Sequence, residues 1–260
     1  MALKDQIALI TGAGRGIGRA IALRFAAEGA AVLLTARTAA EIASVAQEIQ
    51  RAGGRAECVA ADVARPEECQ RIFAAATRLF GRVDILVNNA GMFGPVRPAQ
   101  EITPQEWNEV LAVNLSSAFY LSRLVLPEMC SRSSGAILNI SSVAAKAAFG
   151  LNVPYATSKA GLLGLTRSLA AETARKGVRV NAICPGPVAE TRMSKELGEA
   201  LAERAGVDPS EMFRQFLQGI LQGRAQTADE IAAAAVFLCS QEATAITGQS
   251  INVDGGMSFY

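Results

Sequence analysis

The sequence contains no histidine among its 260 residues. This absence excludes a Ser-His-Asp triad and the histidine ligands of the usual metal sites, so we expect no metal. Neither sign of charge dominates, because 25 Lys and Arg residues face 24 Asp and Glu residues, for a net charge of +1. There is no basic block or acidic tail. We therefore expect neither a nucleic-acid partner nor a membrane-surface partner.

Cysteine is also scarce. The five cysteines are scattered, odd in number and contain no CxxC pair. This usage is typical of reduced thiols in a cytosolic protein, so we expect a cytoplasmic location. The N-terminus has no charged segment followed by a long apolar stretch, and no apolar run reaches the length of a bilayer. We expect neither a signal peptide nor a membrane span.

Short apolar runs recur along the chain, and most are continuous rather than alternating. They lie at 7–11, 31–36, 56–61, 83–89, 135–141, 178–184 and 249–255. Continuous runs suit strands buried on both faces of a parallel sheet, and segments with helical spacing separate them. The order predicts a Rossmann-like, doubly wound α/β sheet of about seven parallel strands with helices on both faces. We expect one domain over residues 1–260.

Local signals mark the ends of several expected helices. Gly29 suits the position after a helix over 19–29. Thr38 and Glu41 have the spacing of a capping box at the start of the next helix. Pro66 lies near the first position of a third helix.

One region interrupts the alternation of strands and helices. About forty residues without a strand separate Cys184 from the last expected helix, 228–240. Within them, Asp208-Pro209-Ser210-Glu211 has the cap, proline and glutamate of a helix start. Its apolar residues fit either additional core or a helical substrate lid over about 187–225.

A glycine-rich loop, TGAGRGIG at 11–18, follows the first expected strand. Gly12, Gly16 and Gly18 permit a tight turn and let the N-terminus of a helix approach a pyrophosphate. A tight turn without a ligand would show the same glycines. The position at the start of a strand-helix series favours a dinucleotide site.

The stretch VPYATSKAG at 153–161 offers a proton donor. Tyr155 and Lys159 lie four residues apart, which places them on one helix face. A free phenol has a pKa of about 10, and a nearby ammonium lowers it toward the range of useful proton transfer. An ordinary helix surface shows the same spacing, so a catalytic role for Tyr155 and Lys159 requires further polar residues at the same site. Ser142 and Asn114 are the candidates.

Five motifs occur in the order and at the spacings of the short-chain dehydrogenase/reductase family. They are TGAGRGIG (11–18), NNAG (88–91), Asn114, Ser142 with YATSK (155–159), and PG (185–186). The match extends from Ile7 to about Gly256. The sequence is identified as a member of this family, most similar to 3-oxoacyl-(acyl carrier protein) reductases and related carbonyl reductases. The resemblance implies a homotetramer with the helices around 104–130 and 155–176 in one interface.

The resemblance implies a catalytic role for four residues. Tyr155 is the acid/base, and Lys159 lowers its pKa and binds the nicotinamide ribose. Ser142 orients the carbonyl group, and Asn114 holds a water that completes the proton relay.

The resemblance also implies a nicotinamide cofactor, and the end of the second strand selects which one. Ala36 stands where NAD-preferring members carry aspartate, and Arg37 and Arg15 suit a 2′-phosphate. Two solvated surface arginines are the alternative. We expect NADP(H), with NAD(H) less favoured. The other expected cofactor contacts are Gly12, Gly14, Gly16, Ile17, Gly18, Asp62, Val63, Asn89, Ala90, Gly91, Tyr155, Lys159, Pro185, Gly186, Val188 and Thr191. Asp62 also suits a helix cap, and Thr191 lies one residue further from the PG pair than in most members.

The expected substrate contacts are largely apolar and suit an uncharged ketone: Ala144, Leu151, Asn152, Pro187, Met193, Phe213 and Phe216. Within the family, a 3-oxoacyl thioester is the first interpretation, and a diketone, polyol or other secondary alcohol is the alternative. A non-catalytic NADP(H)-binding sensor or scaffold is an alternative of another class. For carrier-protein docking, Lys176 matches one of the family's two basic positions, whereas Ser133 occupies the other and Arg132 is adjacent.

Overall fold

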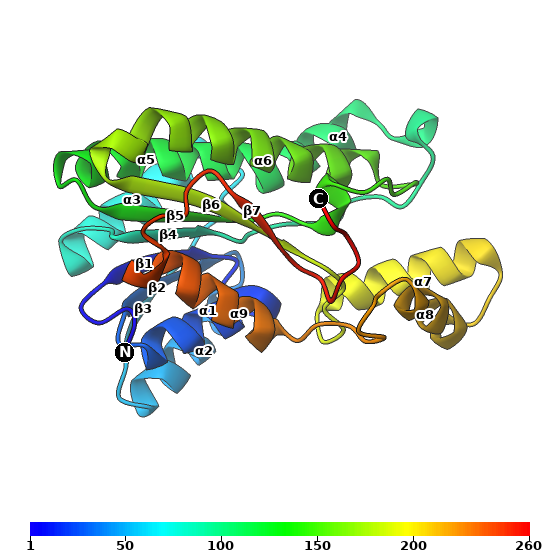
Figure 1. The fold of residues 1–260 in the computed structure, drawn as a ribbon, viewed down its shortest axis with the longest axis horizontal. Helices are drawn as coiled ribbons and strands as arrows, with labels where there is room; N and C mark the ends of the chain where they lie inside the picture. Colours follow the sequence, from blue (N-terminus) through cyan, green and yellow to red (C-terminus); the bar gives the residue numbers. More distant parts are fainter.

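The computed structural model describes residues 1–260. Its centre is a sheet of seven parallel strands (Figure 1). They are β1 (Ile7–Thr11), β2 (Ala31–Ala36), β3 (Arg55–Ala60), β4 (Ile85–Asn88), β5 (Gly135–Ile140), β6 (Val178–Pro185) and β7 (Ser250–Val253), in the spatial order β3-β2-β1-β4-β5-β6-β7. The order reverses beside β1, which pairs with both β2 and β4. Ligands of such sheets bind at the carboxyl ends of the strands, at this reversal.

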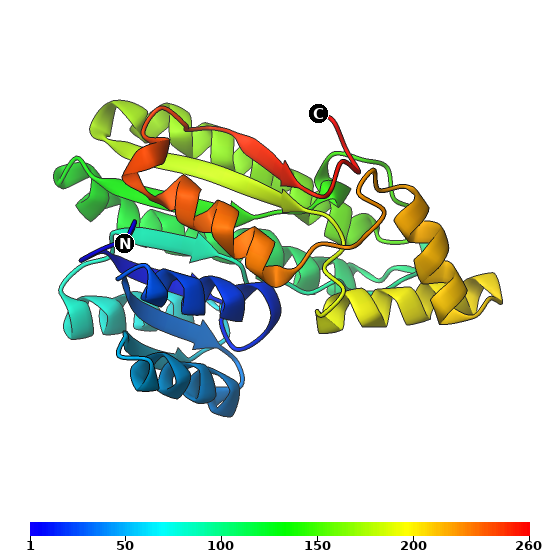
Figure 2. The ribbon, with the colours of Figure 1, turned by 60° about the horizontal axis from the view of Figure 1, so that its bottom comes forward.

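Helices cover both faces of the sheet (Figures 1 and 2). One face carries α1 (Gly16–Ala27), α2 (Ala39–Arg51) and α9 (Ala228–Cys239). The other carries α3 (Pro66–Phe80), α4 (Pro104–Leu111), α5 (Ser117–Ser131) and α6 (Val153–Thr173). Two further helices, α7 (Arg192–Ala205) and α8 (Pro209–Gln218), project at the end of the sheet to which the strands point (Figure 2). The predicted fold class is confirmed.

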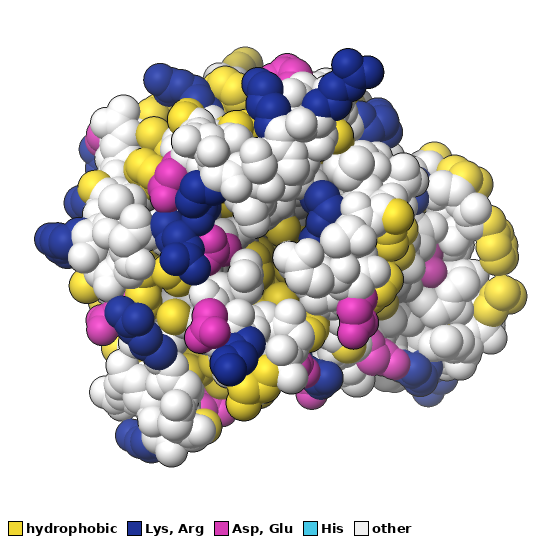
Figure 3. Space-filling model, turned by 60° about the vertical axis from the view of Figure 1, so that its left-hand side comes forward, with side chains coloured by type: hydrophobic (Ala, Val, Ile, Leu, Met, Phe, Trp, Pro, Cys, Tyr) yellow, Lys and Arg dark blue, Asp and Glu magenta, His cyan; other side chains and the backbone are white.

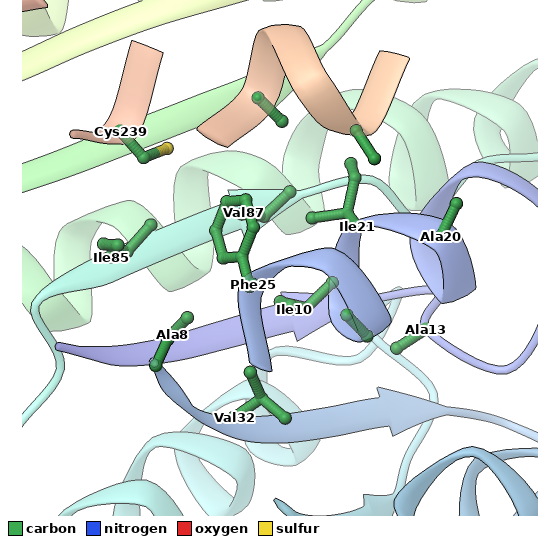
Figure 4. Close-up of a cluster of buried hydrophobic side chains, with 14 of the residues drawn as sticks. Ala8, Ile10, Ala13, Ala20, Ile21, Phe25, Val32, Ile85, Val87 and Cys239 are labelled. Atoms are coloured by element: carbon green, nitrogen blue, oxygen red, sulfur yellow. The ribbon is translucent and has the colours of Figure 1, made fainter. Parts of the chain in front are cut away.

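The apolar strands are buried from both sides. In β1, Ile10 belongs to a core cluster with α1, α2 and α9, whereas the adjacent Leu9 belongs to a second cluster with α3 and α5. Figure 4 shows Phe25 projecting from α1 onto the face of the sheet, close to Val87 of β4. Burial of each such large side chain stabilises the fold by about 1.5–3 kcal/mol. Two faces of burial explain why the runs are continuous rather than alternating.

Most of the predicted helix ends are confirmed. Gly29 has a φ of +90°, as a glycine after a helix requires, and Pro66 opens α3. Asp208 caps α8 by accepting a hydrogen bond from Ser210 N at 2.8 Å. The capping box at Thr38 is wrong, because the Thr38 side chain makes no cap hydrogen bond. The Glu41 carboxylate instead pairs with Arg15 at 3.0 Å, and a charged partner makes the stronger hydrogen bond.

By length and composition, the helical stretch Pro104–Ser131 is a candidate membrane span, although the sequence analysis expected none. A five-residue π-helical turn, Ala112–Ser116, joins α4 to α5 in this stretch. Its 28 residues are long and apolar enough to cross a membrane, which no apolar run of the sequence suggested. Length and composition are weak evidence for a span, since a core helix of a soluble protein passes the same test. In this chain α5 packs against α3 and the sheet.

Charges of both signs are interspersed on the molecular face in Figure 3. Over the whole chain, exposed charges often form ion pairs, such as Arg19 with Glu48 at 2.6 Å and Arg71 with Glu68 at 2.6 Å. Pairs of this kind contribute little to stability because water screens them. On this face, charge alone therefore does not mark a binding site.

Candidate active site

The glycine-rich loop is built for close contact with an anion. A Cβ on Gly18 would lie 2.2 Å from Gly12 O and 2.4 Å from Asn89 Nδ2, so only glycine fits there. The residue before α1, Arg15, makes no side-chain cap hydrogen bond, and the first turn of α1 contains no acidic residue. The first N–H groups of the helix and the positive end of its dipole thus remain available to an anion. These features fit the pyrophosphate of a dinucleotide.

The NNAG segment holds the end of β4 against this loop. Asn89 Nδ2 donates to Thr11 O at 2.8 Å and to Gly12 O at 3.2 Å. The backbone N–H groups of Asn89 and Ala90 both donate to Thr11 Oγ1 at 2.9 Å. The ends of the two strands that flank the reversal of strand order are therefore fixed relative to each other.

Tyr155 and Lys159 occupy the first two turns of α6 and are both buried. Lys159 Nζ lies 5.7 Å from the centre of the Tyr155 ring. The ammonium donates to Ile140 O, at the end of β5, at 2.8 Å. An ammonium has three donors, so two more are available for the hydroxyl groups of a bound ribose.

The structure distinguishes the two serines that follow β5. Ser141 Oγ donates to the backbone oxygen of Lys159 at 2.8 Å and so fixes α6 to the sheet. Ser142 is the one beside the phenol, where its side chain acts to lower the pKa of Tyr155. It also accepts a hydrogen bond from Ala144 N at 3.1 Å. Position thus favours Ser142 over its neighbour as the partner of Tyr155.

Burial decides the protonation of the pair. It raises the pKa of Tyr155 above its ordinary value, against the smaller opposite effect of Ser142. Burial also lowers the pKa of Lys159 to about 8. The sequence-based expectation of a lowered Tyr155 pKa is therefore wrong for this arrangement, because desolvation disfavours the phenolate more than its surroundings favour it. The phenol is therefore protonated at neutral pH, and efficient proton transfer from it requires further stabilisation of the phenolate.

Asn114 lies in the π-helical turn and is almost completely buried. Its Oδ1 accepts from Met92 N at 2.8 Å, and its Nδ2 donates to Met92 O at 2.9 Å and to Ser158 Oγ at 3.0 Å. A Cβ on Gly91 would lie 3.4 Å from Lys159 Nζ and 3.5 Å from Asn114 Oδ1, so this glycine faces both groups. π-Helical turns are frequent at functional sites, and this one places Asn114 against Met92 and Ser158, next to the catalytic helix.

Replacing Asn114 with alanine is expected to reduce kcat for ketone reduction by roughly 10- to 100-fold. This loss is smaller than the full contribution of general acid–base catalysis, because the variant keeps Tyr155 as the proton donor. The substitution removes the amide that, with Lys159, borders Gly91 and that would hold the water of the proton relay. Steady-state kinetics and calorimetric titration with NADPH measure the effect. A loss of melting temperature with an unchanged kcat would show that Asn114 has only a structural role.

Two residues of the site were missed by the sequence analysis. Ser158 Oγ donates to Tyr155 O at 2.7 Å and accepts from Asn114, so it joins the two catalytic candidates. Its place inside YATSK was the available signal. Phe93 lies against Tyr155, with ring centres 4.6 Å apart and planes inclined by 32°. Phe93 comes two residues after NNAG, and no sequence pattern indicates that its ring reaches the phenol.

The expected substrate residues lie in three places. Ala144, Asn152 and Leu151 surround the start of α6, where Asn152 is buried with its Oδ1 unpaired. Leu151 has a φ of +67°, a strained conformation for this residue, and its oxygen accepts from Arg97 N at 2.9 Å. Pro187 follows β6, and Met193 lies in the first turn of α7. Phe213 and Phe216 lie on α8.

The helices of the expected lid remain separate from the catalytic residues. No residue of α8 is buried, and Phe213 is 41% exposed. In Figure 1, α7 and α8 form a projecting hairpin. The structure thus does not bring Phe213 and Phe216 onto Tyr155.

The start of α7 contacts the glycine-rich loop in spite of the additional residue before Thr191. Thr191 caps α7, donates to Val188 O at 2.9 Å, and places its methyl carbon 3.3 Å from the position of a Cβ on Gly16.

Asp62 does not cap α3, whose cap position is Arg65. The Asp62 carboxylate instead accepts a hydrogen bond from Ala64 N at 3.1 Å in a turn.

Two arginines lie near the end of β2, as predicted. Arg37 is exposed directly after Ala36 and takes part in none of the ion pairs of the chain. Arg15 forms its ion pair with Glu41, and both side chains are partly exposed. The two guanidinium groups thus differ, because one is free and the other has a carboxylate partner.

The basic positions associated with carrier-protein docking lie far from Tyr155. Lys176 follows the far end of α6, whose 21 residues span about 31 Å. Arg132 donates to Asp84 Oδ1 and to Val83 O, both at 2.8 Å. No basic pair therefore lies beside the catalytic residues of the same chain.

Comparison with known proteins agrees with this geometry. The family model described as short chain dehydrogenase matches residues 6–202. The chain is 39% identical over 257 residues to the 3-oxoacyl-(acyl-carrier-protein) reductase FabG of Escherichia coli (strain K12), with 99% of each chain covered. A structure of a single-residue variant of the actinorhodin polyketide ketoreductase with NADPH is similar, with a TM-score of 0.94, 36% identity and complete coverage of both chains. A structure of NAD⁺-bound xylitol dehydrogenase has a TM-score of 0.94 and 29% identity, over 98% of this chain and 100% of that one.

Proposed function

This chain belongs to the short-chain dehydrogenase family and is an oxidoreductase, and we propose that it reduces a 3-oxoacyl thioester to the 3-hydroxyacyl product with NADP(H). One observation carries the proposal: Tyr155, Lys159, Ser142 and Asn114 converge at the carboxyl end of β5, next to the glycine-rich loop. The chain has no histidine, and Tyr155 is the buried, protonated phenol beside Ser142, so we assign it as the proton donor.

The chain's own residues then divide the work. A nicotinamide cofactor held by the glycine-rich loop and Lys159 would supply hydride to the carbonyl carbon, and negative charge would then develop on the carbonyl oxygen. Ser142 donates a hydrogen bond to that oxygen, and Tyr155 transfers its phenolic proton to it. Lys159, fixed by Ile140 O, stabilises the resulting phenolate and binds ribose hydroxyls. Asn114 connects the ammonium to solvent through a water, which restores the proton.

The preference for NADP(H) rests on the end of β2. Ala36 places no carboxylate against a 2′-phosphate, and Arg37 is free to bind one. We expect Arg37→Ala to weaken NADPH binding about tenfold, as the loss of a charge-assisted contact implies, and to leave NADH binding within twofold. Calorimetric titration with each cofactor measures this difference. If wild-type protein binds NADH as tightly as NADPH, the proposed preference is wrong.

The assignment of the substrate rests on apolar surroundings and on the similarity to a 3-oxoacyl reductase. The similarity to xylitol dehydrogenase makes a polyol, or another secondary alcohol, the second candidate. A panel of 3-oxoacyl thioesters, diketones and sugars, run with both cofactors, separates them. No turnover on any member, despite tight NADPH binding, would instead indicate a sensor or scaffold.

Three further proposals concern the location of the protein, its assembly and the segment after β6. We place the protein in the cytoplasm, in keeping with its five free cysteines. We expect a homotetramer, for which Phe119 on α5, Phe237 on α9 and Ile251 on β7 offer exposed apolar contacts. The segment 187–225 would then act as a substrate lid whose α8 closes over Phe93 and Tyr155 when substrate binds.

A further inference from the structure

Glu41 brings a negative charge to the place where an adenosine ribose is read. It lies in the first turn of α2, five residues after the end of β2. Its carboxylate pairs with Arg15 Nη1 at 3.0 Å. It also packs on the glycine-rich loop, since a Cβ on Gly14 would lie 2.8 Å from Glu41 Cβ and 2.9 Å from Glu41 Oε2. The side chain therefore fills the space beside Gly14 of the loop.

Capping of α2 does not explain this position. Thr38, the cap residue, makes no side-chain cap hydrogen bond, whereas α4 and α9 both have complete capping boxes. The Glu41 carboxylate thus points away from its own helix end and toward the loop. Its charge also reaches Arg192 at the start of α7, where it adds to the larger effect of Glu196 in raising the pKa of that guanidinium.

We propose that Glu41 is a specificity-determining residue that occupies Arg15 in place of the 2′-phosphate of the cofactor. The inference rests on the proposed use of NADP(H). A 2′-phosphate and the Glu41 carboxylate require the same guanidinium, because each is an anion that matches its donor geometry. Binding of NADP(H) must break the Arg15–Glu41 pair, whereas binding of NAD(H) leaves the pair intact. Glu41 therefore narrows the preference for NADP(H) that Ala36 and Arg37 establish.

The expected effect is moderate because both partners are partly exposed. The side chain of Arg15 is 55% exposed and that of Glu41 is 35% exposed. Exposed ion pairs are weak, so their removal changes an equilibrium by about three- to fivefold rather than by orders of magnitude.

Glu41→Gln tests the proposal without any turnover. The probes are 2′,5′-ADP and 5′-AMP, which differ only in the 2′-phosphate, and calorimetric titration gives the dissociation constant of each. We expect the variant to bind 2′,5′-ADP about three- to fivefold more tightly and 5′-AMP within a factor of about 1.5. Glu48→Gln is the matched control, since it removes the same charge from α2 and frees Arg19, 2.6 Å from Glu48 in the wild-type protein. It is expected to leave both constants unchanged.

A second background tests the competition for Arg15. In an Arg15→Ala protein, the gain from Glu41→Gln should fall below about twofold, because the guanidinium with which Glu41 forms its ion pair is gone. A gain that persists in full there overturns the proposal, as does equal tightening by Glu41→Gln and Glu48→Gln or no tightening by either. Failure of the proposed NADP(H) preference is seen separately, as a wild-type protein that binds 5′-AMP as tightly as 2′,5′-ADP.

Discussion

Replacement of Tyr155 with phenylalanine is expected to reduce kcat for ketone reduction by about 10³-fold or more, with NADPH bound as tightly as before. The phenol lies beside Ser142 and is the group that we assign as proton donor to the carbonyl oxygen, and positioned proton transfer contributes about 10²–10⁴-fold. The phenylalanine ring keeps the contact with Phe93, so the packing of the site is preserved. Steady-state kinetics, calorimetric titration and a melting curve measure the three expectations.

Tyr120→Phe provides the matched control for this variant. Tyr120 lies on α5 and packs against the core cluster on the α3 side of the sheet, away from the site. It should lose no more than about twofold in kcat. If Tyr155→Phe retains near-normal turnover, another proton donor operates and the proposed mechanism fails.

Replacement of Lys159 with methionine is expected to remove at least about 10²-fold of the activity and, at the same time, to stabilise the fold at pH 7. A buried lysine whose pKa is about 8, against 10.5 when unperturbed, costs on the order of 3 kcal/mol while it is protonated. Loss of its hydrogen bond to Ile140 O offsets about 1–2 kcal/mol. A net gain of about 1 kcal/mol corresponds to a rise in Tm of about 3 °C. Urea unfolding and kinetics measure the two effects.

The gain in unfolding free energy of Lys159→Met over the wild-type protein should shrink as the pH rises. Below pH 8 the folded wild-type protein carries the full cost of the charged lysine, so the advantage of Lys159→Met is greatest there. Between pH 8 and about 10 the folded protein loses this proton before the unfolded chain does, so the advantage shrinks. Lys146→Met is the control, because Lys146 makes two hydrogen bonds, to Ser250 O and Asn252 Oδ1, and its loss should not stabilise. An advantage that grows with pH contradicts this account.

The sequence predicts the sheet well because burial on two faces leaves a direct mark. Runs such as 7–11 and 31–36 are continuous, and the strands have the same bounds. The capping box at Thr38 failed because the motif specifies only a spacing, and Glu41 finds a charged partner across the loop. Arg15 belongs to a distant part of the chain, so no local pattern contains that competition.

The catalytic residues were named from motifs, but their electrostatics required the structure. The spacing of Tyr155 and Lys159 suggests a lowered phenol pKa, whereas burial of both groups reverses the direction. Phe93 reaches the Tyr155 ring only because the loop after β4 folds back onto α6. For Phe213 and Phe216, the sequence correctly indicated a helix. It could not indicate that this helix lies away from Tyr155. Interactions between segments far apart in the sequence account for each difference.

Transfer of deuterium from NADPH deuterated at the reactive C4 position to a ketone is the most direct test of the central claim. The product alcohol is analysed by mass spectrometry for wild-type protein and for Tyr155→Phe. We predict that wild-type protein places one deuterium on the carbinol carbon of a 3-oxoacyl thioester or another ketone of the panel, and that the variant forms almost no deuterated product. Tight binding of NADPH without deuterium in any product of the wild-type protein would contradict the assignment of this site as a reductase.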